Sequence, residues 1–395
     1  MSMAVTPNNN SEDNFVYYNG RKLRKGFTTG TTATAATVAA IRTLLNQEPQ
    51  ETVTVHAANG KIAIFDVEQT DFDKNAASCA IKKDGGDDQD ATDGALIFAK
   101  VSLRSDDEIH LDGGKGVGRV TKEGLANKPG IPAINPTPRR VIKEAARKEL
   151  GSNLGANIVI SVPEGEKIAK LTYNPRLGIV GGISILGTSG VVTPMSESSW
   201  KHSISIEMNI HRKRGDKAIV LVPGNYGEDF AKDELGIADD KIVQMSNFVG
   251  YVLHETQRLK FNKVLIVGDL GKMIKVAAGI FSTHSKDADA RAEIMVANLA
   301  LMGGVPTEFL QKINNCLTTI SMIKLINQAG YQDVYQIIVD KIKKRTEKLL
   351  AHREPHIEID AVIFSRESGF LAASKPVQEI CLLYTSPSPR DGLLS

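Results

Sequence analysis

Short apolar segments alternate with helical patterns through residues 151–380, and this alternation restricts the possible folds of the chain most strongly. The strand-like segments are Asn157–Val162, Ile183–Leu186, Ala218–Val222, Ile242–Gln244, Lys263–Val267 and Glu358–Phe364. Helical patterns such as Trp200–Arg212 and Phe248–Leu259 lie between them. Apolar strands separated by helices predict a mainly parallel sheet with helices on both faces. We therefore expect a Rossmann-like α/β domain over residues 151–380, with further helices toward its end.

The preceding part of the chain has a mixed pattern. Helical periodicity covers Thr31–Leu45 and Pro138–Leu150, and alternating strand patterns lie between them, beginning with Glu51–Val55 and Lys61–Val67. This pattern predicts an α+β domain over residues 21–150. Residues 1–20 are polar and are expected to be disordered. The whole chain is thus predicted to be an α/β protein with two domains and a boundary near residue 150.

Pro175–Glu197 carries five glycines among apolar and β-branched residues. Glycine adds backbone entropy that is lost on folding, so such a density indicates a tight turn or the close approach of a ligand. Ile183–Leu186 has the pattern of a strand, and Gly187–Gly190 that of the turn after it. A tightly packed turn without any ligand is the alternative.

Two further strands run into glycine turns, in Ala218–Asn225 and Lys263–Lys272. Glycine turns at the carboxyl ends of parallel strands form the crevice in which adenosyl cofactors bind. The pattern does not distinguish S-adenosylmethionine from NAD or ATP. The predicted cofactor-binding residues are Gly181, Gly182, Gly187, Thr188, Gly190, Gly224 and Gly268.

A threonine-rich turn, Lys25–Thr32, directly precedes the first predicted helix. The hydroxyls of Thr28, Thr29 and Thr31, with the exposed amides of a helix N-terminus, suit a carboxylate or a phosphate. An ordinary helix cap and turn explains the same residues equally well.

Four basic residues stand among glycines and prolines: Lys115, Arg119, Arg139 and Arg140. Lysine and arginine in such loops are suited to pair with carboxylates, and arginine does so through two parallel hydrogen bonds. The GGKGVG sequence at residues 113–118 lacks the strand and helix of a dinucleotide fingerprint, and Lys115 does not fit a Walker A pattern.

Candidate proton carriers are Asp87, Asp88 and His284. The two aspartates belong to the acidic loop Asp84–Gly94, which also has the composition of a weak cation site or of a solvated loop. His284 follows a helix and lies between two hydroxyl residues, as a general base, a substrate contact or a structural histidine would.

Composition excludes several classes of protein. A formal net charge of +2 over 395 residues argues against a dedicated nucleic-acid binder. The three cysteines do not have the spacing of zinc ligands, so a structural zinc site is not indicated. No apolar run is long enough to span a membrane, and the N-terminus does not resemble a signal peptide. We expect a cytoplasmic protein. Cys381–Ser395 reads like a translated sequencing adapter, fits neither a strand nor a helix, and is set aside as an artefact.

Several blocks resemble one family in the same order along the chain. They are LRKGFTTGTTATAA, KKDGGDDQDATDGA, GGKGVGRVTKEGL, PAINPTPRR, NPRLGIVGGISILGTSGVVTPMSE and KVAAGIFSTHSKDADAR. They resemble the CbiD family, the cobalt-precorrin-5B (carbon 1) methyltransferases of anaerobic cobalamin biosynthesis, from about Leu23 to Ala372. Thr32 stands where the family often has cysteine, and Asp269 where it often has histidine.

The resemblance implies methyl transfer from S-adenosylmethionine to carbon 1 of a cobalt corrinoid, giving cobalt-precorrin-6A. Cobalt then enters only as part of the substrate, and no protein-bound metal is expected. The anionic macrocycle suits the basic and threonine residues of the first domain, and the second domain would hold the cofactor. Asp87, Asp88 or His284 would tune the protonation of the macrocycle.

Two alternatives remain. A non-catalytic corrinoid or tetrapyrrole escort would need no adenosyl cofactor, and a nucleotide-dependent phosphotransferase would use GGKGVG with ATP and magnesium. We expect no nucleic-acid or membrane partner. A homo-oligomer and transient contact with neighbouring cobalamin-pathway enzymes remain open.

Overall fold

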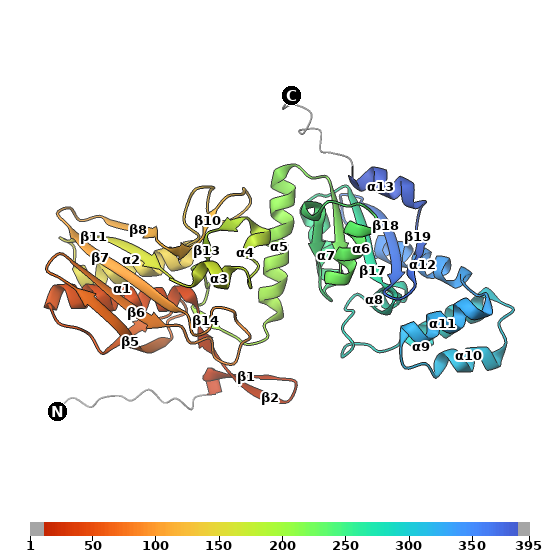
Figure 1. Cartoon of the computed structure of the whole chain (residues 1–395), viewed down its shortest axis with the longest axis horizontal. Helices are drawn as coiled ribbons and strands as arrows, with labels where there is room; N and C mark the ends of the chain where they lie inside the picture. Colours follow the sequence, from red (N-terminus) through yellow and green to blue (C-terminus); the bar gives the residue numbers. More distant parts are fainter. Residues whose placement is uncertain (1–11, 386–395) are drawn as a thin grey trace, which may run out of the picture. The chain divides into compact units, whose positions relative to one another are not determined.

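A computed structural model describes residues 12–385 and divides the chain into two compact units, Met1–Ser198 and Ser199–Ser395. The boundary expected near residue 150 lies instead inside unit 1. The reason is strand β11 (Gly155–Ser161), which pairs with β7 (Leu96–Arg104) and β8 (Ile109–Gly113) of unit 1 rather than opening a second sheet. Figure 1 shows the course of the chain through each unit.

Unit 1 is built on a six-stranded sheet of order β4-β5-β6-β7-β11-β8. All neighbours are antiparallel except β11 and β8. The other strands are β4 (Thr52–His56), β5 (Ile62–Phe72) and β6 (Ala76–Lys82). Apolar side chains alternate along the strands, so one face of the sheet packs on helices α1 (Thr29–Asn46) and α2 (Pro136–Leu150). This confirms the two helices and the strand pattern predicted for the first domain.

Helix α1 is the centre of the unit 1 core, although its first turns are rich in threonine. Thr34 and Thr37 are buried, and their hydroxyls donate to the carbonyls of Gly30 and Ala33 at 2.9 and 2.8 Å. Buried hydroxyls need such partners. A helix can supply them one turn back, so the threonines fit the core without an external partner.

Short elements complete unit 1. They are the 3₁₀ turn Glu12–Asn14, β1 (Phe15–Tyr18), β2 (Arg21–Arg24), β3 (Gly26–Phe27), β9 (Gly116–Val117), β10 (Arg119–Val120), α3 (Gly165–Ala169), α4 (Asn174–Leu177), β12 (Ile179–Val180), β13 (Gly182–Ile183) and β14 (Val191–Val192).

Two expectations about these short elements are wrong. Residues 15–18 form a strand paired with β2, whereas residues 1–20 were expected to be disordered; residues 1–11 lie outside the described residues. Of Ile183–Leu186, only Ile183 is in a strand, and that strand pairs with β9 of unit 1.

Unit 2 contains a five-stranded sheet of order β16-β15-β17-β18-β19. Its strands are β15 (Ala218–Val222), β16 (Ile242–Gln244), β17 (Lys263–Asp269), β18 (Glu358–Ser365) and β19 (Gly369–Ala373). The first four are parallel and β19 is antiparallel. The apolar runs of the second half predict the four parallel strands, whereas β19, which begins with exposed residues, was not predicted.

Both faces of this sheet are covered, which explains why its strands read as continuous apolar runs. Ile219 and Leu221 of β15 face the larger core, whereas Val220 and Val222 face the smaller one. The larger core is closed by helices that include α5 (Glu197–Arg214), α7 (Val249–Arg258) and α12 (Asp333–Leu350), and the smaller one by α6 (Asn225–Asp233) and α13 (Val377–Thr385).

The remaining helices of unit 2 are α8 (Leu270–Ala277), α9 (Arg291–Met302), α10 (Thr307–Asn314) and α11 (Thr319–Ala329). Helix α13 corrects one expectation, because the segment from Cys381 was expected to fit no helix. Cys381–Thr385 lies in α13, and Tyr384 is buried against the sheet. Residues 386–395 lie outside the described part. Among residues 12–385, no helix combines the length and the apolar character that crossing a membrane requires.

Candidate functional site

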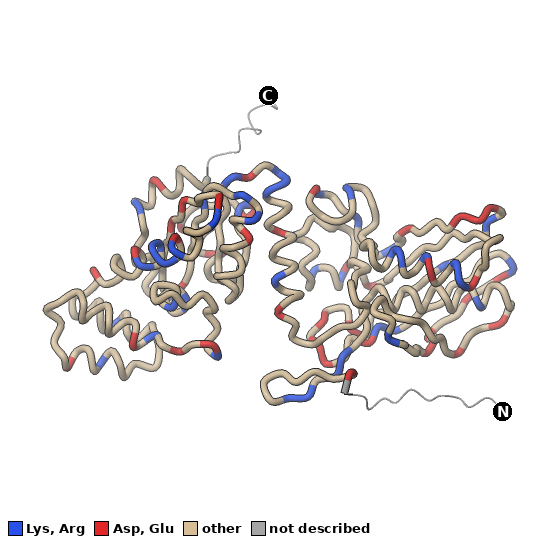
Figure 2. Tube along the Cα trace, turned by 180° about the vertical axis from the view of Figure 1, so that it is seen from behind, with Lys and Arg blue, Asp and Glu red and all other residues tan. Residues whose placement is uncertain are grey.

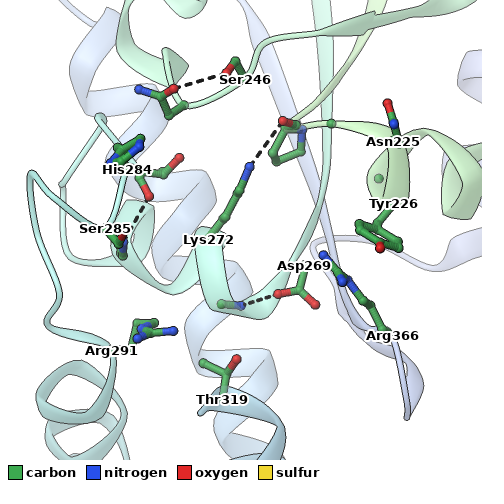
Figure 3. Close-up of a pocket in the computed structure, with 17 residues that line it drawn as sticks. Asn225, Tyr226, Ser246, Asp269, Lys272, His284, Ser285, Arg291, Thr319 and Arg366 are labelled. Atoms are coloured by element: carbon green, nitrogen blue, oxygen red, sulfur yellow. Dashed lines mark hydrogen bonds between the residues drawn. The ribbon is translucent and has the colours of Figure 1, made fainter. Parts of the chain in front are cut away.

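A cavity of about 620 Å³ opens in unit 2 where the parallel strands end (Figure 3). Part of its lining comes from residues at the end of β17 or soon after β15, β16, β17 and β18: Pro223–Gly227, Ser246, Asn247, Asp269, Lys272 and Arg366. The chain runs from β15 to β16 on one side and then to β17 on the other, so the strand order reverses between β15 and β17. Such a reversal is where open parallel sheets bind ligands.

Asp269, the last residue of β17, provides the only carboxylate among the residues that line this cavity. It caps helix α8, and its Oδ1 accepts from the backbone N–H of Gly271 at 2.8 Å. Burial raises the pKa of this carboxyl above its ordinary value, although the Gly271 hydrogen bond and the charges of Arg366 and Lys272 oppose the shift. A buried carboxylate with a raised pKa is suited to a cationic partner.

Lysines approach the same space from helix α8. Lys272 donates to the carbonyl of Pro223 at 3.4 Å, and Lys275 to the carbonyl of Thr283 at 3.0 Å. Burial lowers the pKa of both ammonium groups, in Lys275 with help from the neighbouring charge of Arg291. Spacing of three residues on one helix puts both side chains on the same face.

Arg366 and Tyr226 form one wall of the cavity. The Arg366 guanidinium lies over the Tyr226 ring, 3.1 Å from its centroid, and both side chains lie beside Asp269 in Figure 3. Tyr226 is about half exposed. Its ring therefore offers an apolar surface at the rim of a largely polar cavity.

Basic groups outnumber the one acidic group of the lining. Lys272, Lys275, Arg291 and Arg366 all line the cavity, and Arg291 alone of them forms an ion pair, with Asp289 at 2.8 Å, among the described residues. An excess of positive charge in a hollow favours an anionic ligand group. Over the described trace as a whole the two signs are interspersed (Figure 2), so this excess is local.

Three of the predicted site residues lie at this cavity. Gly224 and His284 line it, and Gly268 directly precedes Asp269. His284 is exposed, and its Nδ1 accepts from the backbone N–H of Lys286 at 3.1 Å. An accepting Nδ1 leaves the proton of a neutral imidazole on Nε2. The remaining ring nitrogen of His284, Nε2, is then a hydrogen-bond donor and not a general base.

The other predicted cofactor residues, from Gly181 to Gly190, lie in unit 1, where the glycine-rich turn packs against the threonine-rich turn. Thr29 Oγ1 accepts from the N–H of Leu186 at 2.9 Å, and Thr31 Oγ1 donates to the carbonyl of Gly190 at 2.8 Å. Thr28 caps α1 through a hydrogen bond from the N–H of Thr31. These hydroxyls are therefore used inside the protein.

Two glycines of this turn have no room for a side chain. A Cβ at Gly187 would lie 2.3 Å from Thr28 Oγ1, and one at Gly190 would lie 2.6 Å from Thr31 Oγ1. Both also have positive φ, 130° and 79°. Close packing on α1 accounts for them. Gly181 and Thr188 are exposed, whereas Gly182 is buried and pairs with Gly116.

The acidic loop is neither free nor fully solvated. Asp87 accepts from the N–H of Arg24 at 2.6 Å, and Asp88 from the N–H of Met195 at 3.0 Å. Asp90 accepts from the buried Lys83 ammonium at 2.8 Å. No group of three or more metal-ligating side chains was found among residues 12–385.

The predicted basic residues of unit 1 have separate surroundings. Lys115 lies in the loop before β9, Arg119 is exposed and bonds the carbonyl of Gly130 at 3.1 Å, and Arg140 pairs with Glu144 at 2.8 Å. Arg139 differs. Its Nη1 donates to the carbonyl of Leu111 at 3.3 Å, whereas its Nη2 is buried with no partner among the described residues.

Sequence reasoning missed most of the cavity lining. The missed residues are Asn225, Tyr226, Ser246, Asn247, Lys272, Lys275, Thr283, Ser285, Arg291, Thr319 and Arg366. A usable signal was present for some of them. Asn225 and Arg366 come just after apolar strands, where parallel sheets place ligand contacts, and Lys272 belongs to the glycine turn after β17.

Comparisons with known proteins agree with the resemblance of the sequence blocks. Residues 16–194 match the family described as CbiD, and residues 282–375 match the family described as CbiD, C-terminal domain. A curated cobalt-precorrin-5B C(1)-methyltransferase from Listeria welshimeri is 53% identical over 92% of this chain and 98% of its own length. The enzyme of the same name from Photorhabdus laumondii is 47% identical over 92% and 96%.

A crystal structure of a cobalamin biosynthesis protein (cbiD) from Archaeoglobus fulgidus is also similar, with 28% identity, a TM-score of 0.37, and coverage of 70% of this chain and 88% of that one. The family matches and the near full-length curated relatives determine the classification: this chain belongs to the CbiD family.

Proposed function

We propose that this protein methylates carbon 1 of cobalt-precorrin-5B, in anaerobic cobalamin biosynthesis, with S-adenosylmethionine as the methyl donor and cobalt-precorrin-6A as the product. The observation that carries this proposal is the 53% identity to a relative of that name over 98% of its length. The activity belongs to the whole chain, because the alignment includes both units.

The donor site that we propose is the cavity of unit 2, with Gly224 and Gly268 at the turns that frame it. Four parallel strands with a reversed strand order support a Rossmann-like description of this unit. The exposed ring of Tyr226 suits an adenine, and the Asp269 carboxylate suits the positive charge of the donor.

For the corrinoid, with its many carboxylate arms, we propose binding by Lys115, Arg119, Arg139 and Arg140 of unit 1. Arg139 supports this best, because its unpartnered buried nitrogen is ready to donate. For Thr28, Thr29 and Thr31 we propose an indirect role, since their hydroxyls already hold the Gly187–Gly190 turn in place.

In the reaction, the methyl group leaves the sulfonium sulfur, which keeps the electron pair of the broken S–C bond, and carbon 1 supplies the pair for the new C–C bond. The sulfonium is intrinsically reactive, so positioning of sulfur, methyl and carbon in line accounts for most of the catalysis. His284 would act as a hydrogen-bond donor through Nε2, and Asp87 or Asp88 would set the protonation of the macrocycle. For the location of the reaction we propose the cytoplasm.

An anaerobic assay with cobalt-precorrin-5B and methyl-labelled S-adenosylmethionine tests this function. We expect the label on carbon 1 of the corrinoid and one S-adenosylhomocysteine per turnover. Label at another ring carbon, or none with a correctly folded protein, would contradict the proposal. An escort protein would instead bind the corrinoid and transfer nothing, and a phosphotransferase using the loop at residues 113–118 would bind ATP with magnesium.

A further inference from the structure

One corner of the unit 2 cavity holds two ammonium groups whose donors are mostly unused. Lys272 donates to the Pro223 carbonyl and Lys275 to the Thr283 carbonyl, and each ammonium has three donors. Neither lies within ion-pair distance of a carboxylate in the part of the chain that the structure describes. Lys275 is only 2% exposed, so bulk water does not readily supply the missing acceptors.

Thr283 adds an independent observation at the same corner. It lines the cavity, is 3% exposed, and its Oγ1 has no hydrogen-bond partner among residues 12–385. Buried hydroxyls are almost always paired. Its own backbone carbonyl accepts from Lys275, and both residues line the same cavity. Burial also lowers the pKa of Lys272 and Lys275, and it outweighs the opposing charges of the nearby carboxylates.

We propose that Lys272, Lys275 and Thr283 form a carboxylate-binding subsite of the cavity. A carboxylate has four acceptor positions, and two ammonium groups with one hydroxyl can fill them. Which ligand carries this carboxylate rests on the proposed function: both reactants carry carboxylates, and neither carries a phosphate. The carboxylate belongs either to the amino-acid end of the donor or to an arm of the corrinoid.

The donor fits this corner better. Its amino-acid end carries an ammonium beside the carboxylate, and the cavity offers one carboxylate, Asp269, together with the lysine corner. Asp269 lies near enough for its charge to raise the pKa of Lys272, yet the two do not form an ion pair. A carboxylate arm of a corrinoid brings no ammonium group that could pair with Asp269.

The test uses the full-length protein and three ligands. Two of them, S-adenosylhomocysteine and 5′-methylthioadenosine, differ only in the amino-acid end, and the third is the corrinoid. For Lys275→Met we expect a loss of tenfold or more in affinity for S-adenosylhomocysteine and none for methylthioadenosine. Loss of corrinoid affinity alone would assign the subsite to a corrinoid arm. Unchanged affinity for all three ligands, or equal loss for both adenosyl ligands, would overturn the subsite.

Three further variants separate binding from folding. Thr283→Val removes an unpartnered hydroxyl, so the melting temperature of the free protein should not fall, whereas affinity for S-adenosylhomocysteine should. Lys275→Arg keeps the charge and should recover part of the affinity. Lys324→Met, at an exposed lysine of α11 outside the cavity, should leave every affinity unchanged.

The subsite and the proposed function fail in different ways. If the unaltered protein methylates the corrinoid but Lys275→Met keeps all affinities, the subsite alone is wrong. If the unaltered protein transfers no methyl group, succinate serves as the probe. A rise in melting temperature with succinate that Lys275→Met abolishes would then support the subsite, and the absence of such a rise would overturn it.

Discussion

Thr31, in the first turn of α1, donates from Oγ1 to the carbonyl of Gly190 at 2.8 Å, across 159 residues of sequence. This bond ties the two most unusual segments of the sequence, the threonine-rich turn and the glycine-rich turn, to each other. Each of them alone is compatible with a ligand site. In the structure the polar groups of the two turns form hydrogen bonds with each other, so the composition of both turns reflects packing inside unit 1.

Replacing Thr31 with valine should lower the free energy of unfolding by about 1 kcal/mol, because a buried hydrogen bond is lost at nearly constant volume. Urea denaturation followed by circular dichroism measures this change. The matched control is Thr52→Val at an exposed position of β4, for which we expect a change within about 0.5 kcal/mol. Equal effects of the two changes would show that the Thr31 bond contributes nothing.

The sequence predicted the four parallel strands and most helices of unit 2, because β15, β17 and β18 are buried on both faces and read as uninterrupted apolar runs. It did not predict β19, whose first residues are exposed. It did not predict where unit 1 ends. β11 has the same kind of apolar pattern, and nothing local says that its partner is β7 rather than a later strand.

The candidate site was predicted only in part, for a similar reason. Glycine density indicates the close approach of another group but does not say which group, so of two glycines predicted to bind the cofactor, Gly224 lines the cavity whereas Gly187 packs on Thr28. Arg366 carries no local signal except its position after β18. Lys275 and Thr283 become a pair only through the fold, since they lie eight positions apart, across the end of a helix and a loop.

Asp269→Asn should weaken S-adenosylhomocysteine binding by tenfold to a hundredfold, the usual effect of losing a charged hydrogen bond of about 1.5–3 kcal/mol. Asparagine caps helices as well as aspartate does, so the melting temperature should change little. Calorimetry at neutral pH measures the affinity. Full affinity in the variant would exclude Asp269 from the donor site.

The same residue gives a pH prediction. Burial raises the pKa of the Asp269 carboxyl, so it takes up a proton at a higher pH than an ordinary aspartate. Only the ionised form attracts the ammonium of the ligand. Affinity should therefore fall as the pH is lowered through this raised pKa, and the Asn variant should lack that part of the decline. Identical pH profiles for both proteins would contradict the assignment.

Thr346, in α12, is fully buried, and its Oγ1 has no partner among the described residues. Thr346→Val should stabilise the protein by about 1 kcal/mol, because it removes an unpaired hydroxyl at constant shape. Thr256 is the matched control: it is also fully buried, but its hydroxyl donates to the Leu253 carbonyl at 2.6 Å. Thr256→Val should destabilise by about the same amount. Destabilisation by both changes would mean that Thr346 has a partner after all.

Asp216 should make unit 2 sensitive to acid. The residue is buried, and its carboxylate accepts from His211 Nδ1 at 3.1 Å and from Arg214 Nε at 2.9 Å. Burial alone would raise its pKa, but these hydrogen bonds and the charges of Arg214 and Lys241 outweigh burial and lower the pKa to about 2. The folded state therefore holds the ionised form more strongly than the unfolded chain does.

A carboxyl whose pKa is lowered on folding stabilises the protein at every pH above the pKa of the unfolded chain, near 3.8, and that stability is lost as the pH falls toward 2. A tenfold difference in proton affinity between the folded and unfolded states is worth about 1.4 kcal/mol, so Asp216→Asn should cost about 2 kcal/mol at pH 7. The difference in the free energy of unfolding between the two proteins should then shrink between pH 4 and pH 2, as measured by urea denaturation across this range.

The control is Asp239→Asn, at an exposed ion pair with Lys232, which should cost less than about 1 kcal/mol. If the free energy that Asp216→Asn costs stays constant down to pH 2, the charge of the Asp216 carboxylate does not stabilise the folded protein.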